Sequence, residues 1–103
     1  MPLTQRKLDS RTWYAFILAN LELVPAATGV YWLGVDNNTI YIGSTANLNE
    51  RLTAHYYASN PCISKASQFA IELCSNYRER ERELLQAFLN QYGRLPSCND
   101  RIP

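Results

Sequence analysis

The sequence predicts an α+β domain in which a small three-stranded sheet forms the centre of a sandwich with helices. Two runs rich in β-branched and aromatic residues, 29–33 and 39–43, flank a cluster of turn formers at 36–38 and predict a hairpin. Apolar residues alternate with Ala and Glu over 69–73, which predicts a third strand. Apolar residues at helical spacing precede, separate and follow these runs. The predicted order is therefore helix, hairpin, helix, strand, helix.

Length and composition limit the possible classes of protein. A chain of 103 residues with 47% hydrophobic residues is expected to form one domain over residues 1–103. Ten Lys and Arg against nine Asp and Glu give a net charge of +1, so any charged binding site must be local. No apolar run approaches the roughly 18 residues that span a bilayer, and no signal segment is recognisable. We therefore expect a cytoplasmic protein that does not enter membranes.

The cysteines show no pattern typical of a disulfide framework or a zinc site. Cys62, Cys74 and Cys98 make an odd count without C-x-x-C spacing, and His55 is the single histidine. We expect buried free thiols.

The first predicted helix spans residues 10–24. Asp9 and Ser10 offer an N-cap, and the helix is expected to end near Pro25. It should pack on the sheet through the apolar residues that recur at helical spacing, namely Trp13, Phe16, Ile17, Leu21 and Val24. The polar residues 1–9 in front of it are expected to be frayed.

The second predicted helix begins at a capping box, Asn47-x-x-Glu50, and runs to about Tyr57. Arg51 and His55 are four residues apart, so they share one face of this helix. The helix thus presents a guanidinium and an imidazole side by side.

The last predicted helix, 77–92, carries one acidic residue on its apolar side. On a helical wheel Glu81 falls among the apolar residues, whereas Glu79 does not and Glu83 points nearly opposite Leu85. A carboxylate that faces the fold needs a partner, because burying an unpaired charge costs several kcal/mol. A metal ion and an arginine are the two candidate partners.

Two tyrosines, one on each strand of the hairpin, complete a candidate site. If Tyr31 and Tyr41 meet Arg51, His55 and Glu81 over one sheet face, the set suits hydrolysis of a phosphodiester. The carboxylate would hold Mg²⁺, and Arg51 would neutralise the charge of the transition state. A tyrosine would orient or activate the attacking water by relaying a proton to His55 or to solvent. The structural alternatives are packing for the tyrosines, a surface pair for Arg51 and His55, and a buried ion pair for Glu81.

In their order along the chain these residues resemble the GIY-YIG nuclease family. The first signature is present as Gly29-Val30-Tyr31, with Val in place of Ile, and the second as Tyr41-Ile42-Gly43. The family's later positions are matched in turn by Gly43-Ser44, Asn47-Leu48, Arg51, His55, Glu81 ahead of Leu84 and Leu85, Pro96 and Asn99. The resemblance covers residues 25–99, which leaves the predicted helix 10–24 as an extension.

This resemblance implies a three-stranded antiparallel sheet flanked by helices and metal-dependent cleavage of one DNA strand per active site. It implies active-site roles for Tyr31, Tyr41, Arg51 and His55, and divalent-cation binding, as Mg²⁺ or Mn²⁺, for Glu81. It also implies that Gly43, Ser44 and Asn99 support the site. A two-residue slip in the Glu-Arg-Glu string makes Glu83 the rival of Glu81, and the helical wheel favours Glu81.

The leading hypothesis is a divalent-metal-dependent DNA endonuclease that nicks one strand per active site. Family members usually join this domain to a DNA-binding domain, so a separate DNA-binding or targeting protein is an expected partner. The small net charge predicts weak, salt-sensitive binding to DNA. One alternative is a non-catalytic module that binds a DNA structure or a protein. A second is a purely structural role in which Glu81 pairs with Arg51.

Overall fold

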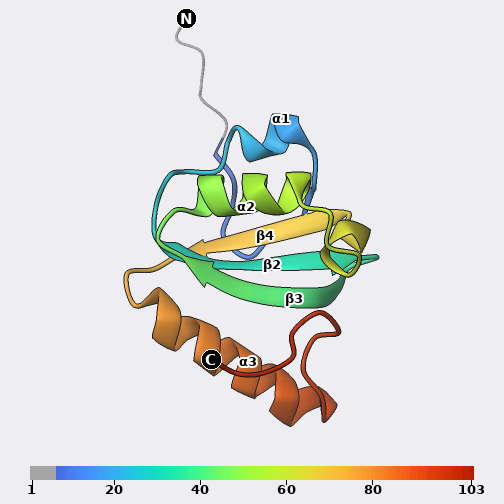
Figure 1. The fold of residues 1–103 in the computed structure, drawn as a ribbon. Coiled ribbons are helices and arrows are strands. Elements are labelled where there is room, and N and C mark those ends of the chain that lie inside the picture. The colour runs from blue at the N-terminus through green and yellow to red at the C-terminus, as the bar shows by residue number, and fades with distance from the viewer. Residues whose placement is uncertain (1–6) are drawn as a thin grey trace, which may run out of the picture.

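The computed structural model describes residues 7–103 and centres on a four-stranded antiparallel sheet (Figure 1). The strands lie in the order β1-β4-β2-β3, so β2 and β4 are the inner strands. Their bounds are β1 Tyr14–Ala15, β2 Gly29–Val35, β3 Asn38–Thr45 and β4 Gln68–Leu73. The α+β class is as predicted, but the sheet has one strand more than the three expected.

Helices cover both faces of the sheet. Helices α1 (Leu18–Leu21) and α2 (Leu48–Tyr57) lie on one face and α3 (Tyr77–Tyr92) on the other (Figure 1). A short 3₁₀ turn, Ile63–Lys65, follows α2. None of the helices within residues 7–103 has the length and hydropathy needed to cross a membrane.

The hairpin β2–β3 turns where the sequence predicts. Asp36 and Asn37 both have positive φ, 52° and 65°, as the two central residues of a type I′ hairpin turn require. Short polar side chains tolerate this left-handed backbone better than bulky ones do. The pairing then runs from Val35 opposite Asn38 to Gly29 opposite Thr45, with one irregularity after Leu33.

The main hydrophobic core lies between the sheet and α1 and α2. Sheet residues Tyr31, Leu33, Phe69 and Ile71 meet helix and loop residues in one cluster, which also includes Leu21, Val24, Leu48, Leu52 and Ile63. Leu85 of α3 is fully buried. An alternating pattern such as that of 69–73 is typical of a strand with one buried face, but both sheet faces are covered here, so Ala70 of β4 is buried as well as Phe69 and Ile71.

The prediction of a helix over residues 10–24 is wrong. The segment instead runs along β4, with Arg11 N donating to Ile71 O at 2.8 Å and Phe16 N donating to Ser67 O at 2.9 Å. Arg11 has φ of 57°, which no helix tolerates, and only Leu18–Leu21 is helical. Hydrogen bonds to the side of β4 replace those a helix would have made. Of the polar stretch 1–9, residues 1–6 lie outside the described part.

The prediction of free thiols is wrong for two of the three cysteines. Cys62 and Cys98 form a disulfide with a Cα–Cα distance of 5.7 Å, and Cys74 is free and half-buried. The two partners are 36 residues apart, one in the loop after α2 and one in the tail after α3. The tail meets that loop because Gly93, with φ of 72°, ends α3 and turns the chain back. Their contact is set by tertiary structure and leaves no spacing signal in the sequence.

Candidate active site

The hydroxyl of Tyr31 lies 2.8 Å from Nε2 of His55. Tyr31 is on the inner strand β2 and is 1% exposed, while His55 is on α2 and half-buried. The rotation of α2 follows from its sequence, because the buried Leu48 and Leu52 precede His55 by seven and three residues on the same helix face. The side chain of Asn47 accepts a hydrogen bond from Glu50 N and fixes where α2 begins, as the capping box predicts.

Tyr41 completes a triangle of rings with Tyr31 and His55. The ring centroids are 6.1 Å apart for the two tyrosines, 5.5 Å for Tyr31 and His55, and 5.6 Å for Tyr41 and His55. A pocket of about 370 Å³ opens beside this triangle. It is lined by Tyr41, Arg51, Ala54, His55, Ala58, Asn60, Ile63 and Cys98. One phenol, one imidazole and one guanidinium therefore line this pocket together with apolar side chains.

Burial determines the protonation states in this group. It lowers the pKa of His55 to about 4, with the Arg51 charge adding to the effect. Burial also raises the pKa of Tyr31, reinforced by Tyr41. His55 is thus neutral and Tyr31 protonated at pH 7, so the phenol can donate to Nε2 of the tautomer protonated at Nδ1.

Arg51 supplies the positive charge of the pocket. The Tyr31 hydroxyl facing its guanidinium raises the pKa of Arg51, and Tyr41 contributes in the same direction. Arg51 is exposed, so it can meet a ligand that enters from solvent. A planar guanidinium in this position suits two oxygens of a phosphate group.

Glu81 approaches from the opposite side of the sheet. It lies on α3, and its Oε1 accepts a hydrogen bond of 2.7 Å from Ser44 Oγ on β3. Glu83, its rival in sequence, is exposed and contacts Arg80 at 3.4 Å. Glu81 therefore faces the sheet and Glu83 faces solvent, as the helical wheel predicts.

Two further predicted positions shape the surroundings of Tyr31 and Tyr41. Gly43 lies opposite Tyr31 in the hairpin, and a Cβ there would collide with the Tyr31 hydroxyl. Asn99 binds the backbone of Ile42, its Oδ1 accepting from Ile42 N at 2.9 Å and its Nδ2 donating to Ile42 O at 3.0 Å. Gly43 leaves room for the phenol, and Asn99 holds the strand that carries Tyr41.

Glu81 is suited to hold a divalent cation. Oε1 is bound by Ser44, and within residues 7–103 no hydrogen bond reaches Oε2. Mg²⁺ is commonly held by one or two carboxylates while it keeps several waters. Three His, Cys, Asp or Glu side chains do not gather anywhere in the described chain, so a site here rests on one carboxylate. The donor set fits a hydrated Mg²⁺ or Mn²⁺ better than a metal that needs nitrogen or sulfur ligands.

The structure thus brings the predicted residues together in two groups. Tyr41, Arg51 and His55 line one pocket and Tyr31 is hydrogen-bonded to His55, whereas Glu81 with Ser44 lies on the α3 side of the sheet. Gly43 and Ser44, consecutive on β3, join the two groups, and the Glu81 charge contributes to the raised pKa of Tyr31. Sequence reasoning missed five residues of the pocket wall, namely Ala54, Ala58, Asn60, Ile63 and Cys98. None of them lies in a pattern that predicts this position.

Comparisons with known proteins identify a family and a fold for this chain. The family model described as the GIY-YIG catalytic domain matches residues 13–92. The fold is similar to solved structures of the GIY-YIG N-terminal endonuclease domain of UvrC from Thermotoga maritima. One, a tyrosine-to-phenylalanine mutant bound to its catalytic divalent cation, has TM-score 0.61 and 24% identity, over 81% of this chain and 93% of that one. Another, bound to magnesium, has TM-score 0.61 and 23% identity, over 80% and 93%. No curated protein matches the sequence.

Proposed function

The chain belongs to the GIY-YIG catalytic-domain family, and from this premise we propose that it hydrolyses DNA phosphodiester bonds with a divalent cation, nicking one strand per active site. The observation that carries the proposal is the hydrogen bond between Tyr31 and His55, because the His55 side chain also lines a pocket together with Arg51. Similarity to structures with a bound catalytic cation supports the metal requirement.

Tyr31 and His55 form the proton-accepting side of the proposed reaction. Because the pKa of Tyr31 is raised, the phenol does not ionise beforehand. It takes a proton from the attacking water while it passes its own proton to Nε2 of His55, which the lowered pKa keeps neutral and ready to accept. Tyr41, in contact with both rings, restricts their positions and faces the same pocket.

Arg51 and Glu81 carry the electrostatic part of the proposal. Arg51 binds the phosphate oxygens and stabilises the charge that develops in the transition state. Glu81, held by Ser44, would bind Mg²⁺ or Mn²⁺, which supplies a Lewis acid for the phosphate and the leaving oxygen. Gly43 and Asn99 support these groups through Tyr31 and Ile42. The small net charge favours a separate DNA-binding or targeting protein as partner.

A nicking assay on supercoiled plasmid tests the proposal. The unaltered protein should convert plasmid to open circles with Mg²⁺ or Mn²⁺ and leave it intact in EDTA. Glu81→Ala should abolish nicking, whereas Glu83→Ala should retain it, because Glu83 faces solvent. Both variants carry one carboxylate less on the same helix, so they are matched in charge.

Absence of nicking on every DNA form by a folded, metal-loaded protein would refute the nuclease. DNA binding without cleavage would then identify the alternative, a non-catalytic module that recognises a DNA structure or a protein. Nicking that survives Glu81→Ala would retain the nuclease and remove Glu81 as its metal ligand.

A further inference from the structure

Three residues form one row across the sheet on the face toward α3. Val30 of β2 pairs with Ser44 of β3 on one side and with Glu72 of β4 on the other. Neighbouring strands are about 4.8 Å apart, so the outer two members of the row are roughly 10 Å from each other. That span is close to the diameter of a helix, about 10 Å with its side chains.

Two consecutive residues of α3 reach the two ends of this row. Arg80 extends to Glu72 on β4, with Nε to Oε2 at 2.6 Å and Nη2 to Oε1 at 3.1 Å. Glu81 extends to Ser44 on β3 at 2.7 Å. Successive residues on a helix point about 100° apart, so the pair straddles Val30 and fixes the rotation of α3 about its axis.

No apolar side chain is fully buried in the first two turns of α3. Leu85 is the one buried residue of the helix, and it lies a full turn beyond Glu81. Polar contacts add to the attachment of these turns, and the two-pronged Arg80–Glu72 pair has the most favourable geometry among them. The Arg80 and Glu72 side chains are 27% and 18% exposed, so the pair is partly shielded from solvent.

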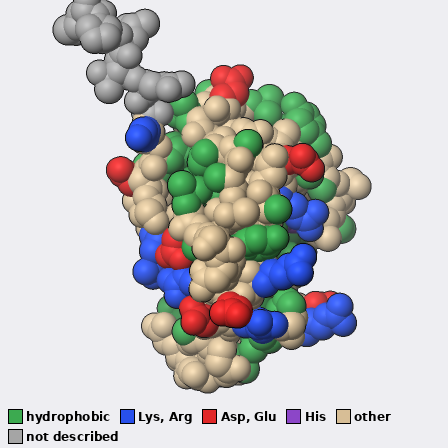
Figure 2. Space-filling model, turned by 90° about the vertical axis from the view of Figure 1, so that its left-hand side faces the viewer, with side chains coloured by type: hydrophobic (Ala, Val, Ile, Leu, Met, Phe, Trp, Pro, Cys, Tyr) green, Lys and Arg blue, Asp and Glu red, His purple; other side chains and the backbone are tan. Residues whose placement is uncertain are grey.

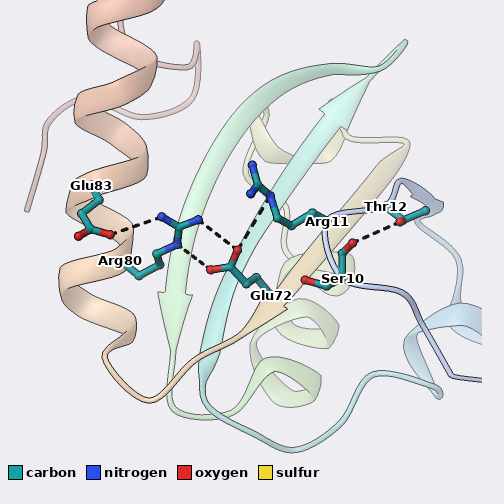
Figure 3. Close-up of polar contacts among 6 residues, drawn as sticks. All are labelled: Ser10, Arg11, Thr12, Glu72, Arg80 and Glu83. Carbon is teal, nitrogen blue, oxygen red and sulfur yellow. Dashed lines mark hydrogen bonds and ion pairs between the residues drawn. The ribbon is translucent and has the colours of Figure 1, made fainter.

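The N-terminal segment and Glu83 add to the same network. Arg11 Nε lies 3.9 Å from Glu72 Oε1, and Arg80 Nη1 lies 3.4 Å from Glu83 Oε1 (Figure 3). Figure 2, which views the molecule from the end where α3 begins, shows basic and acidic side chains next to one another in the band between the sheet and this helix. The carboxylate of Glu72 thus contacts arginines from two separate segments, the N-terminal segment and α3.

We propose that Arg80 and Glu72 are positioning residues for Glu81. Their ion pair sets the rotation of α3, so that the next residue, Glu81, is directed at Ser44 and its second oxygen would be available to hold a divalent cation. This inference deepens the proposed function and rests on it, because it assigns a role through the metal ligand. Neither Arg80 nor Glu72 touches the pocket beside Tyr31 and His55.

Metal binding is the first test. Loss of the free Mn²⁺ signal in electron paramagnetic resonance measures the Kd of the protein without any DNA. Arg80→Met should weaken Mn²⁺ binding about 10-fold, the size of effect found when a group that orients a metal ligand is removed. Arg82→Met is the matched control, an exposed arginine of the same helix, and should leave the Kd unchanged. The double reversal Glu72→Arg with Arg80→Glu should recover most of the affinity.

A second test works without metal and keeps the two proposals separable. In the unaltered background, Glu81→Gln should shift the backbone amide resonance of Ser44, because the two side chains are hydrogen-bonded. In the Arg80→Met background the same change should leave that resonance nearly unmoved, because Glu81 no longer reaches Ser44. The comparison of these two backgrounds shows whether the Glu81 side chain is directed at Ser44. It gives this answer even if the protein binds no Mn²⁺ and the metal-dependent nuclease is thereby refuted.

Either of two results would overturn the positioning role. One is a Kd in Arg80→Met equal to that of Arg82→Met together with a lower melting temperature, which would make the pair structural only. The other is a Ser44 shift of equal size in both backgrounds. A variant too unstable to measure is replaced by Glu72→Gln, which keeps the size of the side chain and removes its charge.

Discussion

Gly43 faces Tyr31 across the β2–β3 hairpin so closely that the phenol occupies the space a side chain at position 43 would need. A Cβ on Gly43 would lie 2.5 Å from Tyr31 Cζ and would overlap the hydroxyl. The glycine of the second signature is therefore required by packing against the tyrosine of the first. This relation links two motifs that are 12 residues apart in the chain.

Gly43→Ala should displace the Tyr31 ring and separate its hydroxyl from His55. We expect a loss of stability of about 1 to 3 kcal/mol, as for other overpacked sites, and loss of nicking. Thermal unfolding followed by circular dichroism, beside the plasmid assay, measures both.

Gly93→Ala is the matched control for Gly43→Ala. Gly93 has φ of 72°, and a Cβ added there would meet no neighbouring atom. Gly93→Ala should therefore lower the free energy of unfolding by about 1 to 2 kcal/mol through backbone strain alone. Nicking should persist in that variant. Equal activity of the two variants would show that Gly43 does not act through Tyr31.

Tyr31→Phe removes the hydroxyl that bonds His55 and leaves the buried ring in place. We expect nicking to fall by about 10² to 10⁴, the range for loss of a general acid–base group. Stability should change by only about 1 kcal/mol, because one hydrogen bond is lost. Tyr57→Phe, an exposed phenol two residues after His55, should cut normally. Full activity of Tyr31→Phe would remove the proton relay from the mechanism.

The pKa of His55 gives a prediction for stability against pH. An ordinary histidine has a pKa of about 6.5, so between that pH and about 4 the unfolded chain binds a proton that the folded chain does not. The free energy of unfolding should therefore decrease as the pH falls through this window, and this contribution should level off below it. Urea unfolding at several pH values measures the slope. His55→Asn should lack this component, and an unchanged slope would contradict the burial effect.

The same pKa sets the acid limit of the proposed reaction. The proton acceptor stays neutral down to about pH 4, so the fall in kcat/KM on the acid side should lie well below 6.5. Nicking rates at fixed ionic strength from pH 4.5 to 8 test this. A midpoint near 6.5 would indicate a solvent-exposed base in place of His55.

Reduction of the Cys62–Cys98 disulfide should destabilise the protein. The bond joins two residues that are 36 positions apart, and it restricts the unfolded chain. This restriction should raise the free energy of unfolding by roughly 2 to 4 kcal/mol. Dithiothreitol should lower the melting temperature of the unaltered protein and of Cys74→Ser, which keeps the bond. The double variant Cys62→Ser with Cys98→Ser should melt at the lower temperature with or without reductant. A reductant effect on that double variant would point to Cys74.

Local sequence signals were sufficient for the hairpin, α2 and α3. The turn at Asp36 and Asn37 and the cap at Asn47 are short-range features, and each stands where the residues predict. A helical wheel of α3 correctly places Glu81 on the side that faces the sheet and Glu83 on the side that faces solvent. It does so because the helix is long and its apolar side is well defined. These elements carry the five residues with proposed chemical roles, Tyr31, Tyr41, Arg51, His55 and Glu81, so most of the site geometry was accessible from the sequence.

The features that sequence reasoning missed depend on contacts between distant segments. Trp13, Phe16 and Leu21 recur at helical spacing, but hydrogen bonds to β4 make the chain extended at Tyr14 and Ala15. The Cys62–Cys98 bond and the Arg80–Glu72 pair likewise join separate elements. In the sequence, Arg80 belongs to an alternating Arg-Glu run that looks like an ordinary solvated surface. Its role is visible only when β4 is placed opposite α3.

The tail after α3 also closes the open side of the sheet. β3 is an outer strand, and such a strand offers unpaired N–H and C=O groups to any other extended chain. Here Cys98 N donates to Ile40 O at 2.7 Å, and the Asn99 amide satisfies both the N–H and the C=O of Ile42. The backbone of Cys98 and the side chain amide of Asn99 thus occupy hydrogen-bonding groups on this border that a further strand would need, so the tail that supports the candidate site also limits strand addition there.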